Sequence, residues 1–491
     1  MTMQERVPDD GVDDALALVG RRRPDPAPRE PARGEPAPGK AAAHETGRHR
    51  ATAWPEARTA AARAGARAAA ARRPGTLPLD RALGRILAGP LHALTDLPSF
   101  DTSAMDGWAV AGPGPWRIAP EQAVLAGHAA ACELVDGDAV RIATGARVPA
   151  GATAVVRGEH ARADSAGQLH ARREVVHGQD IRPRGQECRA GDRLLPAGST
   201  VTPAVLGLAA AAGYDELTVH PRPRVEVLVL GDELLTTGLP REGLIRDALG
   251  PLLGPWLRAL GAEVLGTRRI GDDAEELYAA VTGSAADVVV TTGGTAAGPV
   301  DHVHPVLAKA GAALLVDGVK VRPGHPMLLA ELGGAPAPVP PTTDQTSAPS
   351  APGPTSATDS TGPTGPFAPR HLVGLPGNPL AAVSGLLTLA EPLLRTLAGR
   401  PSPEPYRVPV RQEIQGHPYD TRLVPVVLRG DEAVPLHYNG PAMLRGIAAA
   451  DGMAVVPPGG ARAGQALDVL DLPWPAAGSD PAVSGEGVCF T

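Results

Sequence analysis

The sequence predicts a multi-domain α/β plus β protein, with a central parallel α/β domain, two β-rich N-terminal domains and a small C-terminal β-barrel. Between about residues 221 and 400, near-continuous Val and Leu runs alternate with helical patterns, which is typical of a parallel sheet covered on both faces. On either side, short strand-like runs are separated by Gly and Pro, which is typical of small β domains.

Composition marks the ends of the chain and one insertion as different from the rest. Residues 1–74 are rich in Ala, Arg, Pro and Glu and poor in large apolar residues, so we expect a disordered tail. Within it, 57–73 has strong helix formers, but Ala offers a helix little to pack with. The Pro/Ser/Thr-rich segment 334–369 predicts a disordered insertion between two strands, and 475–491 predicts a second tail.

The structured segments follow from their local patterns. Residues 75–220 read as short strands, with a helix after Thr202-Pro203. Residues 401–474 contain four strand-like runs, which predict the small barrel. In the central segment, strands are expected at 225–230, 262–270, 287–294 and near 371–375, and helices at 245–261, 273–284, 300–311 and from 379 onward.

Charge and cysteine usage exclude several classes of protein. The formal net charge is −7, so no global basic field exists to attract nucleic acid or an anionic membrane. The three cysteines have no Cys-x-x-Cys spacing, so neither a disulfide framework nor a zinc site is indicated. The sequence contains no run of about 20 apolar residues. We therefore expect a cytoplasmic protein without nucleic-acid or membrane partners.

Three predicted strand ends carry turns suited to an anionic ligand. In open parallel sheets, ligands bind beyond the carboxyl ends of the strands, so these turns should converge. Glycines let backbone N–H groups approach an anion, and nearby carboxylates would repel that anion unless a cation such as Mg²⁺ lay between them. The turns are Gly231-Asp232-Glu233, Thr291–Gly294 and Gly374–Pro379.

Each of these features also has a purely structural interpretation. An acid after a strand is most often part of a turn or a helix cap, and Asp272-Asp273 is most simply the cap of the helix that follows. The turn Pro376–Pro379 can be tight for architectural reasons alone. Spacing by itself therefore predicts an α/β domain with an anion site.

Seven longer sequence motifs, which follow one another along the chain in a fixed order, make the prediction of function specific. Together they resemble the molybdopterin molybdenumtransferase family, the bacterial relatives of the gephyrin C-terminal region. The motifs are Phe100–Val110, Arg141–His160, Asp180–Ser199, Arg222–Leu234, Asp287–Val303, Asp317–Pro326 and Gly374–Val383.

The resemblance implies a fold and a reaction. It implies an elongated linking domain, a β-rich domain carrying Asp106, a central domain like the molybdopterin adenylyltransferases, and a C-terminal β domain. It also implies a homodimer with its active site between subunits. The reaction would use Mg²⁺ to insert molybdate into the dithiolene of adenylylated molybdopterin, with release of AMP.

The resemblance assigns roles only where residues match. The implied catalytic residues are Asp106, Asp232 and Asp301, and the implied metal ligands are Asp232, Glu233, Asp247, Asp272 and Asp273. The implied substrate-binding residues are Thr144, Glu159, Gly293, Gly294, Gly298, Arg322, Pro323, Gly324, His325, Pro376, Gly377 and Asn378.

Several positions depart from the family pattern and leave an alternative open. The chain could instead be a divergent, non-catalytic paralogue that binds molybdopterin or a partner enzyme. The sequence also does not distinguish molybdate from tungstate. The departures are Ala248, Leu249, Ala296, Pro299, His325 and Ala442.

Overall fold

The structure is a computed structural model that describes residues 51–127, 133–295, 301–333, 368–400 and 406–474. It divides into two compact units. The larger unit comprises the described parts of Met1–Arg73 and Pro221–Thr491, and the smaller unit is Pro74–His220. Residues 1–50 of the predicted tail 1–74, residues 334–367 of the predicted insertion 334–369 and the predicted tail 475–491 lie outside the described residues.

The larger unit contains a six-stranded sheet in the order β18-β15-β19-β23-β22-β20. The first four strands are mutually parallel, as expected, but β22 runs antiparallel to β23. An antiparallel pair needs no crossover helix between its two strands. The bounds are β15 Arg224–Leu230, β18 Glu263–Ile270, β19 Val288–Thr292, β20 Ala313–Asp317, β22 Leu328–Leu332 and β23 Arg370–Leu375.

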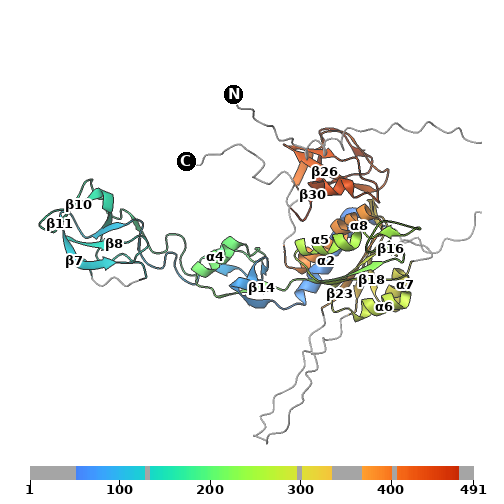
Figure 1. Ribbon diagram of the computed structural model, residues 1–491, viewed down its shortest axis with the longest axis horizontal. Coiled ribbons are helices and arrows are strands. Elements are labelled where there is room, and N and C mark those ends of the chain that lie inside the picture. Colours follow the sequence, from blue (N-terminus) through green and yellow to red (C-terminus); the bar gives the residue numbers. More distant parts are fainter. Residues whose placement is uncertain (1–50, 128–132, 296–300, 334–367, 401–405, 475–491) are drawn as a thin grey trace, which may run out of the picture. The chain divides into compact units, whose positions relative to one another are not determined.

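Helices cover both faces of this sheet, with α2, α5 and α8 on one side and α6 and α7 on the other (Figure 1). Along β15 the side chains alternate, because successive residues of a strand point to opposite faces. Val227 and Val229 join the core with α2 and α5, whereas Leu228 joins the core with α6 and α7. The helices are α2 Trp54–Ala70, α5 Leu249–Ala259, α6 Ala274–Gly283, α7 Val303–Lys309, α8 Pro379–Gly385 and α9 Glu391–Leu397.

The expected helix 245–261 begins later than predicted. Residues Ile245–Arg246 form the short strand β17, and α5 starts at Leu249. Leu249 is buried in the same core as the Val side chains of β15. One departure from the family pattern therefore has a packing role, because an apolar side chain fills a core position at the helix start.

The predicted disorder of residues 1–74 is wrong where the chain is described. Residues 54–70 form α2, whose buried positions recur every three or four residues along one face, as in an amphipathic helix. The small side chains let α2 lie close to α9, so Ala becomes an advantage once a partner helix is present. The buried residues are Trp54, Ala57, Ala61, Ala64, Gly65 and Ala68.

Specific contacts fix α2 against the helical stretch α8–α9. Trp54 Nε1 donates a hydrogen bond to Thr388 Oγ1 at 3.0 Å, and Thr396 Oγ1 donates to the Ala62 carbonyl at 2.8 Å. A Cβ on Gly65 would lie 2.2 Å from the Leu393 carbonyl oxygen, so only glycine allows this approach. Residues 54–70 of the predicted tail are therefore part of the central core.

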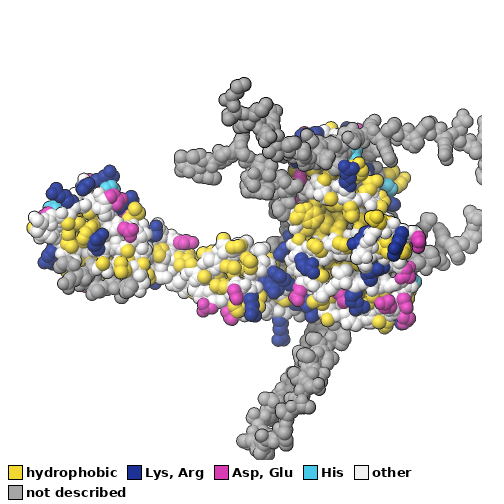
Figure 2. Space-filling view, viewed as in Figure 1, with side chains coloured by type: hydrophobic (Ala, Val, Ile, Leu, Met, Phe, Trp, Pro, Cys, Tyr) yellow, Lys and Arg dark blue, Asp and Glu magenta, His cyan; other side chains and the backbone are white. Residues whose placement is uncertain are grey.

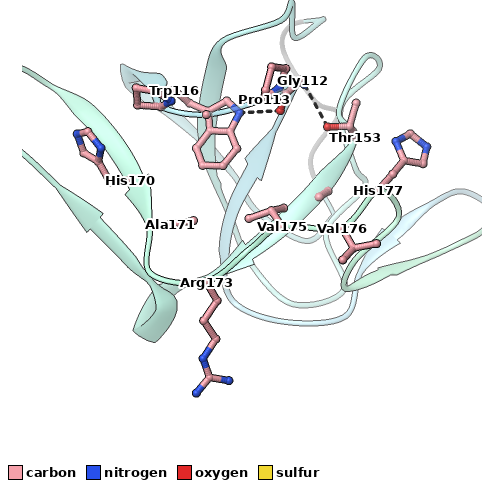
Figure 3. Close-up of a pocket in the computed structure, with 13 residues that line it drawn as sticks. Gly112, Pro113, Trp116, Thr153, His170, Ala171, Arg173, Val175, Val176 and His177 are labelled. Carbon is pink, nitrogen blue, oxygen red and sulfur yellow. Dashed lines mark hydrogen bonds between the residues drawn. The ribbon is translucent and has the colours of Figure 1, made fainter.

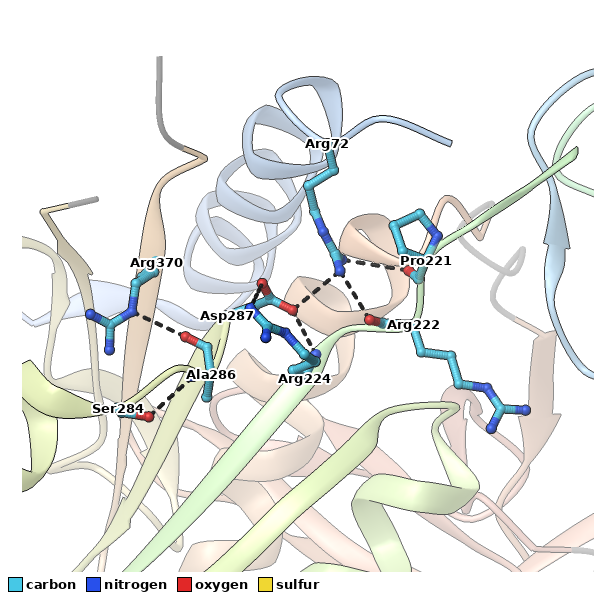
Figure 4. Close-up of polar contacts among 8 residues, drawn as sticks. All are labelled: Arg72, Pro221, Arg222, Arg224, Ser284, Ala286, Asp287 and Arg370. Atoms are coloured by element: carbon cyan, nitrogen blue, oxygen red, sulfur yellow. Dashed lines mark hydrogen bonds and ion pairs between the residues drawn. The ribbon is translucent and has the colours of Figure 1, made fainter. Parts of the chain in front are cut away.

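A cluster of charged groups joins the end of α2 to the first strand of the sheet (Figure 4). Arg72 Nη2 donates to the Arg222 carbonyl at 3.0 Å and lies 3.2 Å from Asp287 Oδ2. The same Asp287 oxygen accepts the backbone N–H of Arg224 at 2.7 Å. Arg370 Nε donates to the Ala286 carbonyl at 3.0 Å. These contacts fix where the chain enters the sheet.

The C-terminal segment contributes most of a second sheet, in which β27-β26-β28-β30-β24 are hydrogen-bonded in order. Strand β21 of the central segment pairs with β26 in parallel. Strand β1, which lies just before α2, pairs with β21. Residues from outside the C-terminal segment therefore complete this sheet. Outside these strands, an isolated β-bridge links Val410 to Ala433. Closure of the sheet into the predicted barrel stays a prediction. The strands are β1 Thr52–Ala53, β21 Val319–Arg322, β24 Tyr406–Pro409, β26 Thr421–Arg429, β27 Glu432–Pro435, β28 Gly452–Val456 and β30 Ala466–Asp471.

The smaller unit is built mainly from strands, as predicted. Its six-stranded sheet has the order β10-β11-β7-β8-β6-β9, and a three-stranded sheet β2-β14-β3 packs with helix α4. Helix α4 begins after Thr202, whose side chain accepts the Val205 N–H as an N-cap. The bounds are β2 Gly75–Pro78, β3 Ile86–Leu87, β6 Gly107–Val110, β7 Trp116–Val124, β8 Asp138–Ile142, β9 Ala154–Arg157, β10 Ala161–Ala163, β11 Gln168–Ala171, α4 Pro203–Ala211 and β14 Glu216–His220.

Among the described residues, the stretch Pro379–Leu397 is long and apolar enough to cross a membrane by length and composition. However, 89% of its apolar window is buried inside the structure, between α2 and the sheet. The core helix of a globular domain passes the same test, so this stretch is weak support for a membrane span.

Candidate functional site

The three turns at the carboxyl edge of the parallel sheet converge, as expected from the sequence. A Cβ on Gly377 would lie 3.6 Å from the Cα of Gly293, and a Cβ on Gly293 would lie 3.6 Å from the Leu230 carbonyl oxygen. Gly231 and Gly293 have φ values of +128° and +83°, which favour glycine. The close approach brings the ends of β15, β19 and β23 together.

A pocket of about 370 Å³ lies beside these turns, between the central segment and the C-terminal segment. It brings together six of the residues that the resemblance implies in substrate binding. It also contains residues of the C-terminal segment that sequence reasoning missed. The lining residues are Arg322, Pro323, Gly324, His325, Pro326, Pro376, Asn378, Ala381, Arg422, Asn439, Gly440 and Pro441.

Two arginines of this pocket are held in place by different partners. Arg322 Nε donates to Asp420 Oδ2 at 2.9 Å, and Asp420 is only 6% exposed. Arg422 donates through Nη1 to the Gln415 carbonyl at 2.7 Å and through Nη2 to Asn439 Oδ1 at 2.9 Å. Burial lowers the pKa of Arg422. Both guanidinium groups are therefore oriented before any ligand binds.

The turn that carries Arg322 has little freedom. Gly324 has φ +112°, and a Cβ there would lie 2.9 Å from Met327 Cε and 3.0 Å from the Ala381 carbonyl oxygen. His325 Nδ1 lies 2.8 Å from the Val319 carbonyl, which makes Nδ1 the protonated nitrogen. Nε2 then becomes a donor to an anion only when the ring gains a second proton.

A larger pocket of about 890 Å³ adjoins the first and shares Arg322, His325 and Pro326 with it. Asp301, an implied catalytic residue, lines this pocket together with His304 and Asp317. His304 Nδ1 lies 2.9 Å from Asp301 Oδ2, and His304 Nε2 lies 2.9 Å from Asp317 Oδ1. The structure therefore places Asp301 on the same cleft as the Arg322 turn.

The five implied metal ligands do not meet in one site. Asp247 Oδ1 accepts the N–H groups of Leu249 and Gly250 at the start of α5, and Asp273 Oδ1 accepts those of Glu275 and Glu276 at the start of α6. These two acids serve as helix caps, the structural interpretation that the sequence also allowed for Asp273. Across the described residues, no group of three or more His, Cys, Asp or Glu side chains could hold a metal.

Asp232 and Glu233 lie at the sheet edge and are exposed. A Cβ on Gly271 would lie 2.8 Å from Asp232 Oδ1, so that glycine leaves room for the carboxylate. The Glu233 carboxylate lies over Gly231, where a Cβ would lie 2.4 Å from Oε2. Asp272 is also exposed. Gly298, Ala296 and Pro299 fall outside the described residues.

In the smaller unit, the structure brings Asp106, Thr144 and Glu159 together on an exposed surface. Asp106 Oδ1 accepts the Thr144 N–H at 2.7 Å, and the Asp106 carbonyl accepts the N–H of Gly158 at 3.1 Å. Hydrogen bonds from the backbone and then the side chain of Thr144 hold the pKa of Asp106 below its usual range. Asp106 is therefore present as a carboxylate near neutral pH.

The smaller unit also has a pocket of about 540 Å³ that contains none of the predicted site residues (Figure 3). Trp116 and Val175 both line it and belong to one hydrophobic cluster, and Trp116 Nε1 donates to the Gly112 carbonyl at 3.0 Å. Thr153 Oγ1 accepts the Gly112 N–H at 3.1 Å. The indole N–H of Trp116 and the backbone N–H of Gly112 are thus satisfied within the protein.

Sequence reasoning missed Arg422, Asn439, Asp420, His304 and Asp317. Arg422 lies next to Arg322 only because β26 pairs with β21, about a hundred residues away in the chain. The histidine in the phrase Asp301–His304 is a local signal that could have been noticed, because i and i+3 residues at a helix start are neighbours.

The fold and the cleft define a multi-domain α/β protein with an arginine-lined pocket beyond the carboxyl edge of its sheet. Three family models match the chain. They are the MoeA N-terminal region (domain I and II) over residues 55–213, the probable molybdopterin binding domain over 226–396, and the MoeA C-terminal region (domain IV) over 407–472.

Individual relatives agree with the family models. Molybdopterin molybdenumtransferase 2 of Mycobacterium tuberculosis is 34% identical over 422 residues, covering 82% of this chain and 95% of that relative. The molybdopterin molybdenumtransferase of Nostoc sp. is 29% identical over 413 residues, covering 80% and 87%. The chain belongs to the molybdopterin molybdenumtransferase family and is an enzyme of molybdenum cofactor biosynthesis.

Solved structures support the fold. Two structures of the molybdopterin biosynthesis MoeA protein of Pyrococcus horikoshii match with TM-scores of 0.65 and 0.64, at 23% and 19% identity. Each match covers 86% of this chain and 99% of the other. The multi-domain class predicted from the sequence is thereby confirmed.

Proposed function

We propose that this enzyme inserts molybdate into the dithiolene of adenylylated molybdopterin, in a Mg²⁺-dependent reaction that releases AMP. The observation that carries the proposal is the pocket with Arg322 and Arg422 beside the converging glycine turns. Molybdate and pyrophosphate are both oxyanions, and arginine presents several donors to such groups in a fixed plane. The relatives' names, which refer to molybdopterin and to molybdenum transfer, support the same reaction.

Arg322 and Arg422 would bind the molybdate. Asp420 takes up the Nε–H of Arg322, which leaves its terminal nitrogens for an oxyanion. His325 lines the same pocket beside Arg322 and would complete the molybdate site. The backbone turns at Gly293, Gly294, Pro323, Gly324, Pro376, Gly377 and Asn378 would place N–H groups and close-packed backbone beside the phosphates.

Asp232 and Glu233 would hold Mg²⁺ together with phosphate oxygens of the substrate. Both carboxylates are exposed at the sheet edge where the turns converge, and Mg²⁺ commonly needs only one or two protein carboxylates besides phosphate. When bound, the ion would neutralise charge at the phosphoanhydride. Asp301 would line the adjoining pocket, and the Asp106 carboxylate with Thr144 and Glu159 would form a second polar surface that contacts the substrate.

We also propose that the enzyme is a cytoplasmic homodimer. Figure 2 shows hydrophobic side chains gathered over the part of the larger unit where Figure 1 labels α5, α2 and α8. Contiguous exposed apolar surface commonly marks a protein interface. Light scattering coupled to gel filtration tests this assembly, and a monomer at micromolar concentration would contradict it.

An in vitro insertion assay tests the reaction. The purified protein is mixed with adenylylated molybdopterin, molybdate and Mg²⁺, and AMP release and activation of an apo-molybdoenzyme are measured. We expect turnover that requires Mg²⁺ and is lost in Asp232→Ala. Asp431→Ala is the matched control, because Asp431 is an exposed acid in the turn between β26 and β27. Tight substrate binding without turnover would instead favour the non-catalytic paralogue.

A further inference from the structure

His304 is held between two carboxylates from different elements. It lies on α7, its Nδ1 is 2.9 Å from Asp301 Oδ2, and its Nε2 is 2.9 Å from Asp317 Oδ1. A neutral imidazole has one N–H donor and one lone pair, so one of these contacts would then set a lone pair against a carboxylate. Only the doubly protonated ring donates to both.

The charges around His304 favour that doubly protonated form. Burial lowers the pKa of His304, but the hydrogen bond to Asp317 and the charges of Asp301 and Asp317 outweigh it, and the net shift is upward. The three side chains are 29%, 15% and 23% exposed, so solvent screens them only in part.

The other charged groups near this cluster lie on the pocket wall and at the far end of the helix. Arg322 and His325 line the same pocket of about 890 Å³. On α6, which packs against α7, Glu275 pairs with Lys309, which also lies 4.3 Å from the Tyr278 ring. Of the charged groups around it, the carboxylates of Asp317 and Asp301 are the ones that raise the pKa of His304.

The cluster connects two parts of the cleft. Asp317 ends β20, and the next two residues support the turn that carries the arginine. The Gly318 N–H donates to the Met327 carbonyl at 3.0 Å, and the Val319 N–H donates to the His325 carbonyl at 2.9 Å. A contact between Asp301 and Asp317 through His304 therefore ties Asp301, just before α7, to the Arg322–His325 turn.

We infer that protonated His304 is a positioning residue that joins Asp301 to Asp317 and so fixes the wall of the larger pocket against the arginine-bearing turn. Loss of its proton would leave a lone pair facing one carboxylate, and that contact would open. The effect on turnover rests on the proposed function, whereas the protonation state of the clamp does not.

The pH profile of molybdenum insertion tests the positioning role. We expect wild-type turnover to fall on the alkaline side as His304 loses its proton. His304→Lys should move this fall to higher pH, because lysine keeps its charge there. His304→Gln should be slower near neutral pH by roughly 10- to 100-fold and lack the fall, so the two profiles meet at alkaline pH. Identical wild-type and His304→Gln profiles would overturn the inference.

His302→Gln is the matched control, because His302 lies in the same segment at the start of α7 and lines neither pocket. We expect its profile to follow the wild type. If His302→Gln reproduces the effect of His304→Gln, the change reflects a general disturbance of the segment, and the specific role of His304 is overturned.

A second measurement separates this inference from the proposed reaction. Nitrogen NMR of histidine-labelled protein, with the His304 signal assigned by its loss in His304→Gln, reports both ring nitrogens without any turnover. We expect both to carry protons at about pH 7. A singly protonated ring would overturn the clamp even if the enzyme is active. Absence of insertion with a doubly protonated ring would reject the proposed function and leave the clamp intact.

Discussion

Arg322 of β21 lies directly opposite Arg422 of β26 in the parallel register of these strands. Among the described residues the two positive charges do not share a counter-ion, because Arg322 pairs with Asp420 while Arg422 bonds to Gln415 and Asn439. Two oriented guanidinium groups side by side repel each other, and an oxyanion between them would relieve that repulsion. The juxtaposition of Arg322 and Arg422 therefore supports the proposed anion site.

Arg322→Lys should weaken molybdate binding although the charge is kept. Lysine offers one compact ammonium group, which cannot bond to Asp420 and present a planar pair of donors to an oxyanion at once. We expect the KM for molybdate to rise about tenfold, with a smaller change in kcat. Steady-state AMP release at varied molybdate concentration measures both constants.

Arg411→Lys is the matched control for this variant. Arg411 Nε also lies 2.9 Å from a carboxylate oxygen, in this case of Glu432, and it lines neither pocket of the cleft. Its KM for molybdate should stay at the wild-type value. An unchanged KM in Arg322→Lys would show that positive charge alone, without the guanidinium geometry, accounts for binding.

Gly65→Ala should destabilise the larger unit, although Ala favours an isolated helix. The added Cβ would lie 2.2 Å from both the Leu393 carbonyl oxygen and Thr396 Oγ1, so α2 and α9 must move apart. We expect the free energy of unfolding to fall by about 1–3 kcal/mol. Gly207→Ala in α4, where a Cβ meets nothing within 4 Å, should instead be neutral or stabilising. Urea denaturation measures the free energy of unfolding of both variants. Equal changes in the two would show that the contact between α2 and α9 has room for an added methyl group.

The sheet and its turns could be predicted because their signals are local. Val runs at 225–230 and 288–290 mark buried strands, and the glycines that follow mark the turns. Helix α2 could not be predicted, because Ala57, Ala61 and Ala64 become a packing surface only against helices more than 300 residues away, as the Trp54–Thr388 hydrogen bond shows. A composition rule cannot recognise a partner so distant in sequence.

The residues of the candidate site also divide into those that local sequence indicates and those that only the fold brings together. The Arg322–His325 turn and the Gly377 turn were found because each is a short phrase of the chain. Arg422 and Asp420 reach that turn only through the pairing of β21 with β26, and Asp317 reaches Asp301 only through His304. The resemblance to a family assigned Asp247 and Asp273 to a metal, but their local positions at helix starts already explain why acids are present there.

His371 should make the protein lose stability in mild acid. It is fully buried on β23, and neither ring nitrogen has a hydrogen-bond partner among the residues that the structure describes. Burial lowers its pKa to about 4 against the opposing charge of Glu331. Because the unfolded histidine binds a proton near its ordinary pKa of 6.5, its contribution to stability is complete above that pH. The loss between about pH 6.5 and pH 4 should reach about 3 kcal/mol.

Chemical denaturation from neutral to acidic pH, in wild type and in His371→Leu, measures this loss. The variant should keep its stability over that range, because the titrating group is gone and a buried apolar side chain replaces a ring without hydrogen-bond partners. His92→Gln, at an exposed position on the short strand Leu91–His92, should retain the wild-type pH dependence. A wild-type slope in His371→Leu would assign the acid sensitivity to other groups.

Arg72→Met should weaken the entry of the chain into the central sheet. The side chain is 13% exposed and its guanidinium bonds to the Arg222 carbonyl and lies 3.2 Å from Asp287, which is 17% exposed. Methionine keeps much of the apolar part of the side chain but removes one charged partner of the Asp287 carboxylate. Arg224 Nη2, at 3.7 Å from Asp287 Oδ1, compensates for this loss only in part. We expect the free energy of unfolding to fall by about 1–2 kcal/mol. Arg73→Met, at the exposed next residue, should change the free energy of unfolding by less than about 0.5 kcal/mol. Equal changes in the two variants would show that the buried contacts of Arg72 do not contribute to stability.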